Sequence, residues 1–303
     1  MKATLVFNPV AGQREVRAEL RQVMGYLAER GWTIEWRETT PEIGATVLTR
    51  EAISQGSEII IAAGGDGTIN GVVNGLVGHP HVKLGILPTG TANVWARESG
   101  ITDSPLLGPN LQAAGKVLVH GTTVEIDVGK AGDLYFLLMA GIGFDALVTR
   151  DTNLDLKKRV GPLAYGWTAI KEALKYRGAR MEITIDGKTI ERYAWMVTIS
   201  NSKLYALFPL AVNASLRDGV LDVGIFAGRT WKVILRHTIS ILLRRHTSEP
   251  KVEFLRGREI TIKSDPPLPI QVDGEPIAKP ITTFSVVPKA LRIVVPAKMA
   301  ANL

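Results

Sequence analysis

Residues 58–68 read EIIIAAGGDGT, an apolar run that ends in three glycines, an aspartate and a threonine. The run is typical of a central parallel strand, which is buried on both faces. Apolar residues at helical spacing follow over residues 69–76. Glycines at a strand-to-helix turn let the backbone approach an anion, and the N–H groups of the helix N-terminus point at that anion. The stretch therefore predicts a phosphate site, and a glycine-rich turn without a ligand is the simpler alternative.

The pattern around this stretch alternates between strands and helices. Apolar strand patterns cover residues 3–7, 33–36, 58–63 and 83–87, and helical patterns cover residues 16–27 and 47–53. This alternation favours an open, doubly wound α/β sheet, whose ligands lie beyond the carboxyl ends of the strands.

After about residue 123 the pattern changes to closely spaced strands. They are expected at residues 123–128, 134–139, 181–185, 193–199, 220–226, 259–263, 270–272, 282–286 and 291–295. Asp186-Gly187 between two of them is a strong hairpin signal. We therefore predict an all-β, antiparallel β-sandwich domain at residues 124–288 after an α/β domain at residues 1–123. Residues 289–303 are expected to pack back on the first domain, and helical insertions are expected at residues 156–177 and 230–245.

Composition narrows the classes of function. The chain of 303 residues has no cysteine, which excludes disulfides, thiolate zinc sites and a cysteine nucleophile. A net charge of +7 favours an anionic partner, but the sequence carries no nucleic-acid-binding signature, so no nucleic-acid partner is expected. No apolar run reaches the roughly 18 residues that span a bilayer. Without a secretory signal, a cytoplasmic protein is expected.

Two further turns accompany the first. Residues 87–93, LPTGTAN, follow one predicted strand, and residues 8–12, NPVAG, follow another. Because the carboxyl ends of parallel strands meet at one edge of a sheet, we expect the three turns to converge. One extended polyphosphate ligand could bridge them.

Together these motifs resemble the diacylglycerol kinase catalytic family, which includes bacterial soluble lipid kinases and sphingosine kinases. The resemblance also covers the segments TPEIG at 40–44, DVG at 127–129, GIGFD at 141–145, VGP at 160–162, DGVLD at 218–222 and VDGE at 272–275. It implies a Rossmann-like, phosphofructokinase-like nucleotide domain, a β-rich lipid-binding domain and an active site in the cleft between them. It also implies ATP and Mg²⁺ as cofactors and a role in lipid metabolism and phospholipid biosynthesis.

The resemblance assigns roles to individual residues. The residues implied to contact ATP are Asn8, Pro9, Gly12, Thr40, Gly64, Gly65, Asp66, Gly67, Thr68, Asn70, Gly71, Thr91 and Asn93. For Thr40, a turn residue before proline is the simpler alternative. Glu275 resembles the general base for the lipid hydroxyl, although a solvated residue after a hairpin turn is the simpler interpretation. Asp66 is implied as the second catalytic residue and as a Mg²⁺ ligand.

Further Mg²⁺ ligands follow from the same resemblance. Asp127 would join Asp66 in a water-linked Mg²⁺ network. Ser215, Asp218 and Val220 would hold a second, structural Mg²⁺, for which an Asp-Gly turn is the alternative. Val94 stands where the family usually has an aspartate, so activity could be weak, differently tuned or absent.

A lipid acceptor predicts peripheral contact with the inner face of the membrane. The helical pattern at 231–245 mixes apolar and basic residues and suits an anionic interface, although a helix packed on a sheet is the commoner explanation. Residues 157–159 form a second basic cluster. Two other functions stay open: an NAD kinase-like enzyme, and a regulator that binds nucleotide or lipid without turnover. The sequence also leaves open whether the chain forms a homodimer.

Overall fold

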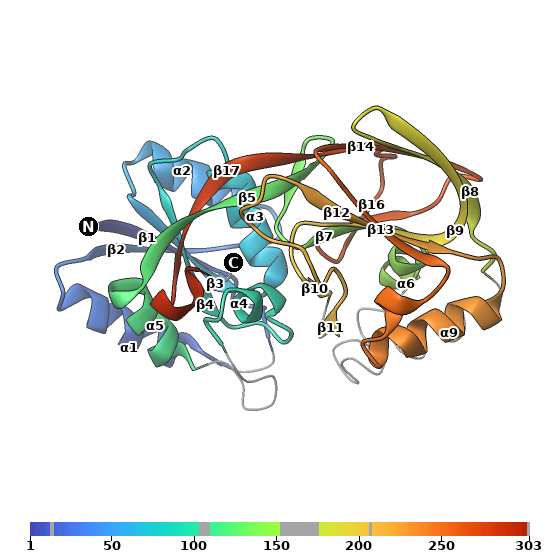
Figure 1. Cartoon of the computed structure of the whole chain (residues 1–303). Helices are drawn as coiled ribbons and strands as arrows, with labels where there is room; N and C mark the ends of the chain where they lie inside the picture. Colours follow the sequence, from blue (N-terminus) through green and yellow to red (C-terminus); the bar gives the residue numbers. More distant parts are fainter. Residues whose placement is uncertain (13–14, 103–109, 152–175, 206–207, 302–303) are drawn as a thin grey trace. The chain divides into compact units, whose positions relative to one another are not determined.

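The computed structural model describes residues 1–12, 15–102, 110–151, 176–205 and 208–301. The chain divides into two compact units (Figure 1). The first consists of Met1–Val128, Ser215–Asp218 and Val287–Leu303, and the second of Gly129–Ala214 and Gly219–Val286. Strands β5 (Thr122–Ala131) and β17 (Thr283–Val295) contribute residues to both units.

The first unit is built on a parallel sheet. Its strand order is β2 (Thr33–Glu38), β1 (Lys2–Phe7), β3 (Ile59–Gly64), β4 (Lys83–Pro88) and then the end of β17. Every pairing along this order is parallel. From β1 the chain first adds β2 on one side and then β3 and β4 on the other, so the topological switch point lies between β1 and β3. Ligands of doubly wound sheets bind at such a point, beyond the carboxyl ends of the strands.

Two pairs of helices cover this sheet. Helix α1 (Arg17–Ala28) packs with α5 (Leu111–His120), and α2 (Ala45–Ser54) packs with α3 (Asp66–Leu76), on opposite faces of the sheet (Figure 1). Glycines permit the close approach within each pair. A Cβ on Gly115 of α5 would lie 2.7 Å from Val23 of α1, and one on Gly75 of α3 would lie 2.6 Å from Thr49 of α2.

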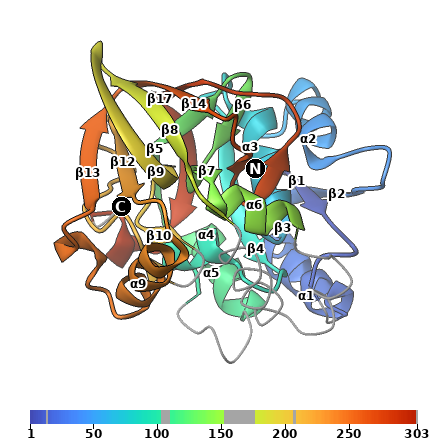
Figure 2. The same cartoon turned by 90° about the vertical axis from the view of Figure 1, so that its right-hand side faces the viewer.

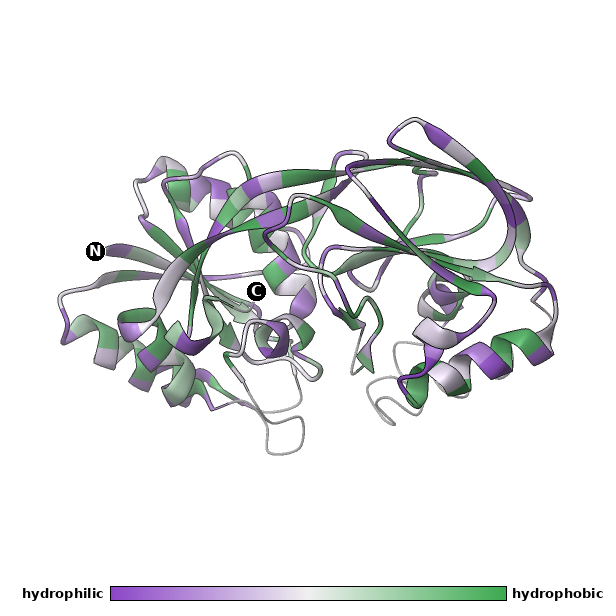
Figure 3. Ribbon diagram, viewed as in Figure 1, coloured by the Kyte–Doolittle hydropathy of each residue, from purple (hydrophilic) through white to green (hydrophobic). Residues whose placement is uncertain are grey.

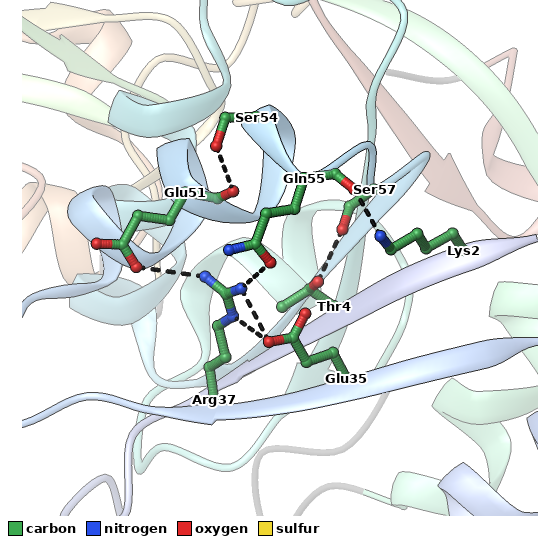
Figure 4. Close-up of polar contacts among 8 residues, drawn as sticks. All are labelled: Lys2, Thr4, Glu35, Arg37, Glu51, Ser54, Gln55 and Ser57. Carbon is green, nitrogen blue, oxygen red and sulfur yellow. Dashed lines mark hydrogen bonds and ion pairs between the residues drawn. The ribbon is translucent and has the colours of Figure 1, made fainter.

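A polar cluster fixes α2 and the turn after it to the edge of this sheet (Figure 4). The guanidinium of Arg37 on β2 contacts the side chains of Glu35, Glu51 and Gln55. The hydroxyls of Thr4 and Ser57 share a buried hydrogen bond of 2.8 Å. Strands β1 and β2 and the α2–β3 turn are therefore joined by side chains as well as by the backbone ladder.

The strands of the second unit pair in antiparallel fashion. The path runs β16, β15, β7, β9, β8, β14 and the start of β17, while β12 pairs with β9 and β13. Its strands are β6 (Leu134–Phe136), β7 (Met139–Gly143), β8 (Ala179–Ile185), β9 (Lys188–Ser200), β10 (Leu204–Tyr205), β11 (Phe208–Pro209), β12 (Leu221–Ala227), β13 (Val252–Gly257), β14 (Glu259–Asp265), β15 (Ile270–Val272) and β16 (Glu275–Ile277). Buried side chains from β7, β8, β9, β12 and β14 form its core. The predicted α/β plus antiparallel sandwich architecture is confirmed.

Local turn chemistry fixes the β8–β9 hairpin, the yellow-green ribbon of Figure 2. Asp186 and Gly187 have φ angles of 47° and 81°, as a two-residue hairpin turn with two positive φ angles requires. The pair Ile185 and Lys188 closes the ladder.

Short helices complete the described chain: α4 (Val94–Glu98), α6 (Phe144–Asp151), α9 (Trp231–Leu242), η1 (His246–Ser248) and η2 (Ala297–Met299). The helix predicted from residue 156 lies outside the described residues up to residue 175, as do the basic cluster at 157–159 and the VGP motif at 160–162. None of the described helices is long and apolar enough to cross a bilayer.

Several elements differ from the sequence prediction. Helix α5 and strands β10, β11 and β16 were not predicted, and the strand predicted at residues 134–139 is divided between β6 and β7. Residues 282–286 and 291–295 belong to one strand, β17, which contains Lys289 at a left-handed φ of 51°. Helix α6 and strand β13 were not predicted, because each is short and neither shows a clear period.

Candidate active site

The glycine turn between β3 and α3 is tightly built. Gly64 ends β3, Gly65 is the N-cap of α3, and Asp66 is the first residue of the helix. A Cβ on Gly64 would lie 2.3 Å from the Thr68 side chain, so only glycine fits there. Thr68 is buried, whereas Gly67, in the first turn of α3, is exposed. The free N–H groups of the first helical turn suit an anion.

The three predicted turns meet at the switch point of the sheet. Gly12 has a φ of 80°, and a Cβ there would lie 2.2 Å from the carbonyl oxygen of Thr89. A Cβ on Gly90 would lie 2.4 Å from the Cα of Gly65. The side-chain amide of Asn8 donates to the hydroxyl of Thr68 at 3.2 Å. Each turn therefore touches another, and glycine is required at the contacts.

Asp66 binds the start of helix α4. The backbone N–H groups of Val94 and Trp95 donate to its two carboxylate oxygens at 3.1 and 2.9 Å. Asn93 turns back on its own loop, because its side-chain oxygen accepts the N–H of Gly90 at 3.0 Å and its amide donates to the carbonyl of Gly90 at 2.7 Å. The Val94 backbone thus contacts Asp66, while its side chain is buried.

The remaining residues predicted to contact nucleotide have different surroundings. Thr40 closes a local turn: its hydroxyl donates to Glu42 at 2.8 Å and accepts the N–H of Ile43 at 3.1 Å. That hydroxyl lowers the pKa of the Glu42 carboxyl. The carbonyl of Gly71 accepts the hydroxyl of Thr46 at 2.8 Å, on the side of α3 that faces α2. Asn70 pairs with Asn74 one turn along α3, and Pro9 and Thr91 are exposed.

Asp127 is a buried member of the first unit. One of its carboxylate oxygens accepts the N–H of Lys289 at 2.8 Å, and its own N–H donates to the carbonyl of Leu216 at 2.6 Å. The side chain of Asp127 therefore fixes Lys289, which has a left-handed φ in β17. The backbone of Asp127 fixes the segment that contains Ser215 and Asp218, and this segment belongs to the same unit. Val220 belongs to the second unit.

The carboxylates of the described residues suit some kinds of metal site and not others. Among the described residues, no group of three or more histidine, aspartate or glutamate side chains gathers at one point. Proteins commonly hold Mg²⁺ through one or two carboxylates together with water and substrate phosphates. Asp66, at the turn that suits a phosphate, fits a Mg²⁺ ion of that kind, and it does not fit an ion held by protein ligands alone.

Glu275 lies directly after a hairpin turn of the second unit. Asp273 and Gly274 have φ angles of 48° and 83°, and Glu275 pairs with Val272 across the turn. The carboxylate of Asp273 accepts three backbone N–H groups, from Leu137 at 2.8 Å, Leu138 at 2.9 Å and Met139 at 3.0 Å. Glu275 itself is exposed. The turn is fixed to the segment before β7, and the glutamate projects from it.

A buried acid supports the same hairpin. The side-chain amide of Gln271 donates to Asp145 at 2.7 Å, and its oxygen accepts the N–H of Gly274 at 2.6 Å. The hydroxyl of Tyr205 also donates to Asp145. Burial raises the pKa of the Asp145 carboxyl. From the sequence alone, Asp145 received no role beyond its motif, and Gln271 was not singled out. The signal for Gln271 is that it is a polar residue between two apolar ones, in the short strand pattern at 270–272.

Comparison with known proteins matches each part of the chain to a known family of domains. Residues 2–131 match the family model "Diacylglycerol kinase catalytic domain", and residues 139–295 match "YegS C-terminal NAD kinase beta sandwich-like domain". The diacylglycerol kinase of Bacillus subtilis is 30% identical over 277 residues, which cover 90% of this chain and 89% of that protein. A diacylglycerol kinase of Staphylococcus aureus is also 30% identical, over 90% of this chain and 86% of its own length.

Solved structures share the fold. A crystal structure of a putative diacylglycerol kinase from Bacillus anthracis superposes with a TM-score of 0.83 at 24% identity, covering 97% of this chain and 95% of that one. A second structure from the same organism gives a TM-score of 0.79 at 23% identity, over 98% of each chain.

Proposed function

Because the chain belongs to the diacylglycerol kinase family, we propose that it transfers the γ-phosphate of ATP to the hydroxyl of a diacylglycerol-like lipid. At the coarser level the protein is a kinase, a phosphotransferase whose family acts on lipids. The observation that carries the finer proposal is the meeting of three glycine-bearing turns at the switch point of the first sheet, where Asp66 and Thr68 stand.

The first unit is the proposed donor side. Phosphoryl transfer depends mainly on positioning and on electrostatic stabilisation of the transferred group. The backbone N–H groups of the Gly64–Thr68 turn would bind the phosphates of ATP. A Mg²⁺ ion bound with ATP would neutralise phosphate charge, and Asp66 would be its protein contact. The contacts of Asp66 with Val94 and Trp95 support this role, because they fix the orientation of the carboxylate.

The second unit is the proposed acceptor side, with Glu275 as general base. The lipid hydroxyl oxygen would form a bond to the γ-phosphorus, and the bond from that phosphorus to the bridging oxygen of ADP would break. The hydroxyl proton would pass to the carboxylate of Glu275. The fixed turn at Asp273 supports this assignment, since a general base must be positioned before the reaction.

A structural Mg²⁺ at Ser215, Asp218 and Val220 is a separate proposal. One carboxylate with backbone carbonyl oxygens is a weak donor set for Mg²⁺, so water would complete the coordination. Its supporting observation is that Gly219, next to Asp218, has a φ of 72°, which bends the segment sharply.

The proposal is tested by incubating the purified chain with Mg²⁺, ATP labelled at the γ-phosphate and a total lipid extract. We expect label in a lipid that mass spectrometry identifies as a phosphorylated diacylglycerol, and loss of labelling when a chelator removes Mg²⁺. Absence of labelled lipid across a broad panel of hydroxyl-bearing lipids would contradict the proposal.

Two alternatives have their own supporting observations. The match of residues 139–295 to an NAD kinase-like sandwich supports NAD as acceptor, and formation of NADP by the same preparation would favour it. Val94 stands where the family usually has an aspartate, and the loss of this carboxylate supports a regulator that binds nucleotide or lipid without turnover. A large gain in turnover for Val94→Asp would show that the natural chain is catalytically impaired. Robust activity that stays unchanged in the variant would show that Val94 does not impair it.

A further inference from the structure

Helix α9 has one buried face and one exposed face. Ile234, His237 and Ser240 are buried. The ring nitrogen Nδ1 of His237 accepts the indole N–H of Trp195 on β9 at 3.0 Å, and Trp195 also packs on Phe226 of β12. These contacts fix the rotation of the helix about its axis, so the residues on its other face are held outward.

The exposed face carries a row of large apolar side chains. Trp231, Leu235, Ile239, Leu242 and Leu243 are 40%, 48%, 46%, 52% and 61% exposed. Four of them recur every fourth residue, at 231, 235, 239 and 243, and therefore lie along one side of the helix. An open groove of about 510 Å³ runs beside this row, and its lining includes Trp231, Leu235, Ile239 and Leu243. Contiguous apolar surface of this kind marks an interaction site.

The charge around the row is mainly positive. Residues 229–248 contain five lysines and arginines, at positions 229, 232, 236, 244 and 245, and no aspartate or glutamate. Three basic residues, Lys232, Arg236 and Arg245, and one acidic residue, Glu249, line the same groove as the apolar row. Arg236 is paired with Glu249 at 2.8 Å. Hydrophobic and hydrophilic residues are interleaved along the helix (Figure 3).

We propose that α9 is a membrane-docking helix that lies in the interface of an anionic bilayer, with Trp231, Leu235, Ile239, Leu242 and Leu243 among the upper acyl chains. The basic residues beside them would contact anionic headgroups. Helices that lie in an interface combine an apolar face that contains tryptophan or leucine with lysine and arginine on the polar flank. The excess of basic residues at the groove, Lys232, Arg236 and Arg245 against Glu249, is the observation that selects an anionic surface as the occupant. The inference concerns binding and does not depend on the proposed transfer reaction.

The experiment measures co-sedimentation of the full chain with two kinds of vesicle, pure phosphatidylcholine and phosphatidylglycerol mixed with phosphatidylcholine. We expect binding to the mixed vesicles to exceed binding to pure phosphatidylcholine by about tenfold or more. Raising the salt from about 0.1 M to about 1 M shortens the Debye length from about 10 Å to about 3 Å, and it should release much of the bound protein. Equal binding to both vesicles, or binding to neither, would overturn the proposal.

Two double variants separate the apolar and the basic contributions. Leu235→Ser with Ile239→Ser should lower binding to mixed vesicles about tenfold, because two exposed side chains no longer enter the acyl region. Arg244→Gln with Arg245→Gln should lower it by a similar factor. Matched controls are Val47→Ser for an exposed apolar residue of α2, and Lys188→Gln with Lys279→Gln for exposed basic residues; both should bind as the wild type does.

Measuring the oligomeric state tests whether a second copy of this chain, and not a membrane, covers the exposed face of α9. If the wild type sediments as a dimer and the Leu235→Ser, Ile239→Ser variant as a monomer with unchanged vesicle binding, α9 is a self-association surface and the proposal is wrong. If the transfer reaction fails in every assay while vesicle binding follows the expected pattern, the proposed function is wrong and the docking helix stands.

Discussion

Gly90 marks the closest approach of two turns in the first unit. A Cβ at this position would lie 2.4 Å from the Cα and 3.1 Å from the N of Gly65. Because these atoms belong to the backbone, they cannot swing aside as the end of a side chain can. Gly90→Ala should therefore separate the two turns, lower the free energy of unfolding by about 1–3 kcal/mol and weaken ATP binding. Denaturant unfolding and calorimetric titration with ATP measure the two effects.

Gly25→Ala is the matched control for this substitution. Gly25 lies within α1, and a Cβ there would meet no atom within 4 Å. Alanine in a helix interior is more favourable than glycine by about 0.5–1 kcal/mol, so this variant should be more stable and bind ATP unchanged. A Gly90→Ala protein that binds ATP as tightly as the wild type would show that the contact between the turns does not shape the nucleotide site.

Two hairpins of the second unit are fixed by the same kind of hydrogen bond. In each, the aspartate of an Asp-Gly turn accepts backbone N–H groups from a neighbouring segment: Asp273 those of residues 137–139, and Asp186 those of Arg258 and Glu259. These N–H groups lower the pKa of the Asp186 carboxyl. Only the Asp273 hairpin carries Glu275. Comparing substitutions at Asp273 and Asp186 therefore separates an effect on stability from an effect on phosphate transfer.

Asp273→Asn and Asp186→Asn should each lower the free energy of unfolding by about 1 kcal/mol, because the amide is a weaker acceptor for N–H groups than the carboxylate is. Only Asp273→Asn should also slow phosphate transfer, since it loosens the turn that positions Glu275. Thermal unfolding and the turnover rate with saturating ATP test both variants. Equal loss of turnover in the two proteins would mean that general stability, and not the position of Glu275, limits the rate.

The elements that the sequence predicts well are those with a strong local signal. Strand β3 and the Asp186-Gly187 hairpin follow from an apolar run and from turn residues that favour positive φ. For β17 the pattern predicts two strands, because residues 288–289, Pro-Lys, interrupt it. The continuity of β17 depends on a distant partner, since the N–H of Lys289 donates to Asp127, and no local pattern contains that information.

At the scale of the whole molecule, the candidate site combines predictable and unpredictable contacts. Strand order predicts that the turns after β1, β3 and β4 converge, and the structure shows that they do. Residues far apart in sequence make the remaining contacts: Asp66 caps α4, and Asp145 reaches Gly274 through Gln271. The pairing of such polar groups depends on packing, which the pattern of apolar residues does not specify.

The proposed division of labour gives each unit one task. In this proposal the turns of the first unit would bind ATP, and Glu275 of the second unit would take the proton only during transfer. A substitution at Glu275 should therefore change the rate of transfer and leave the affinity for ATP intact.

The most direct test is a single-turnover measurement of phosphate transfer to diacylglycerol by Glu275→Gln, with the Kd for ATP measured on the same preparation. Loss of a general base predicts a rate about 10²–10⁴-fold below that of the wild type, with an unchanged Kd for ATP. A transfer rate equal to that of the wild type would show that Glu275 is not the general base.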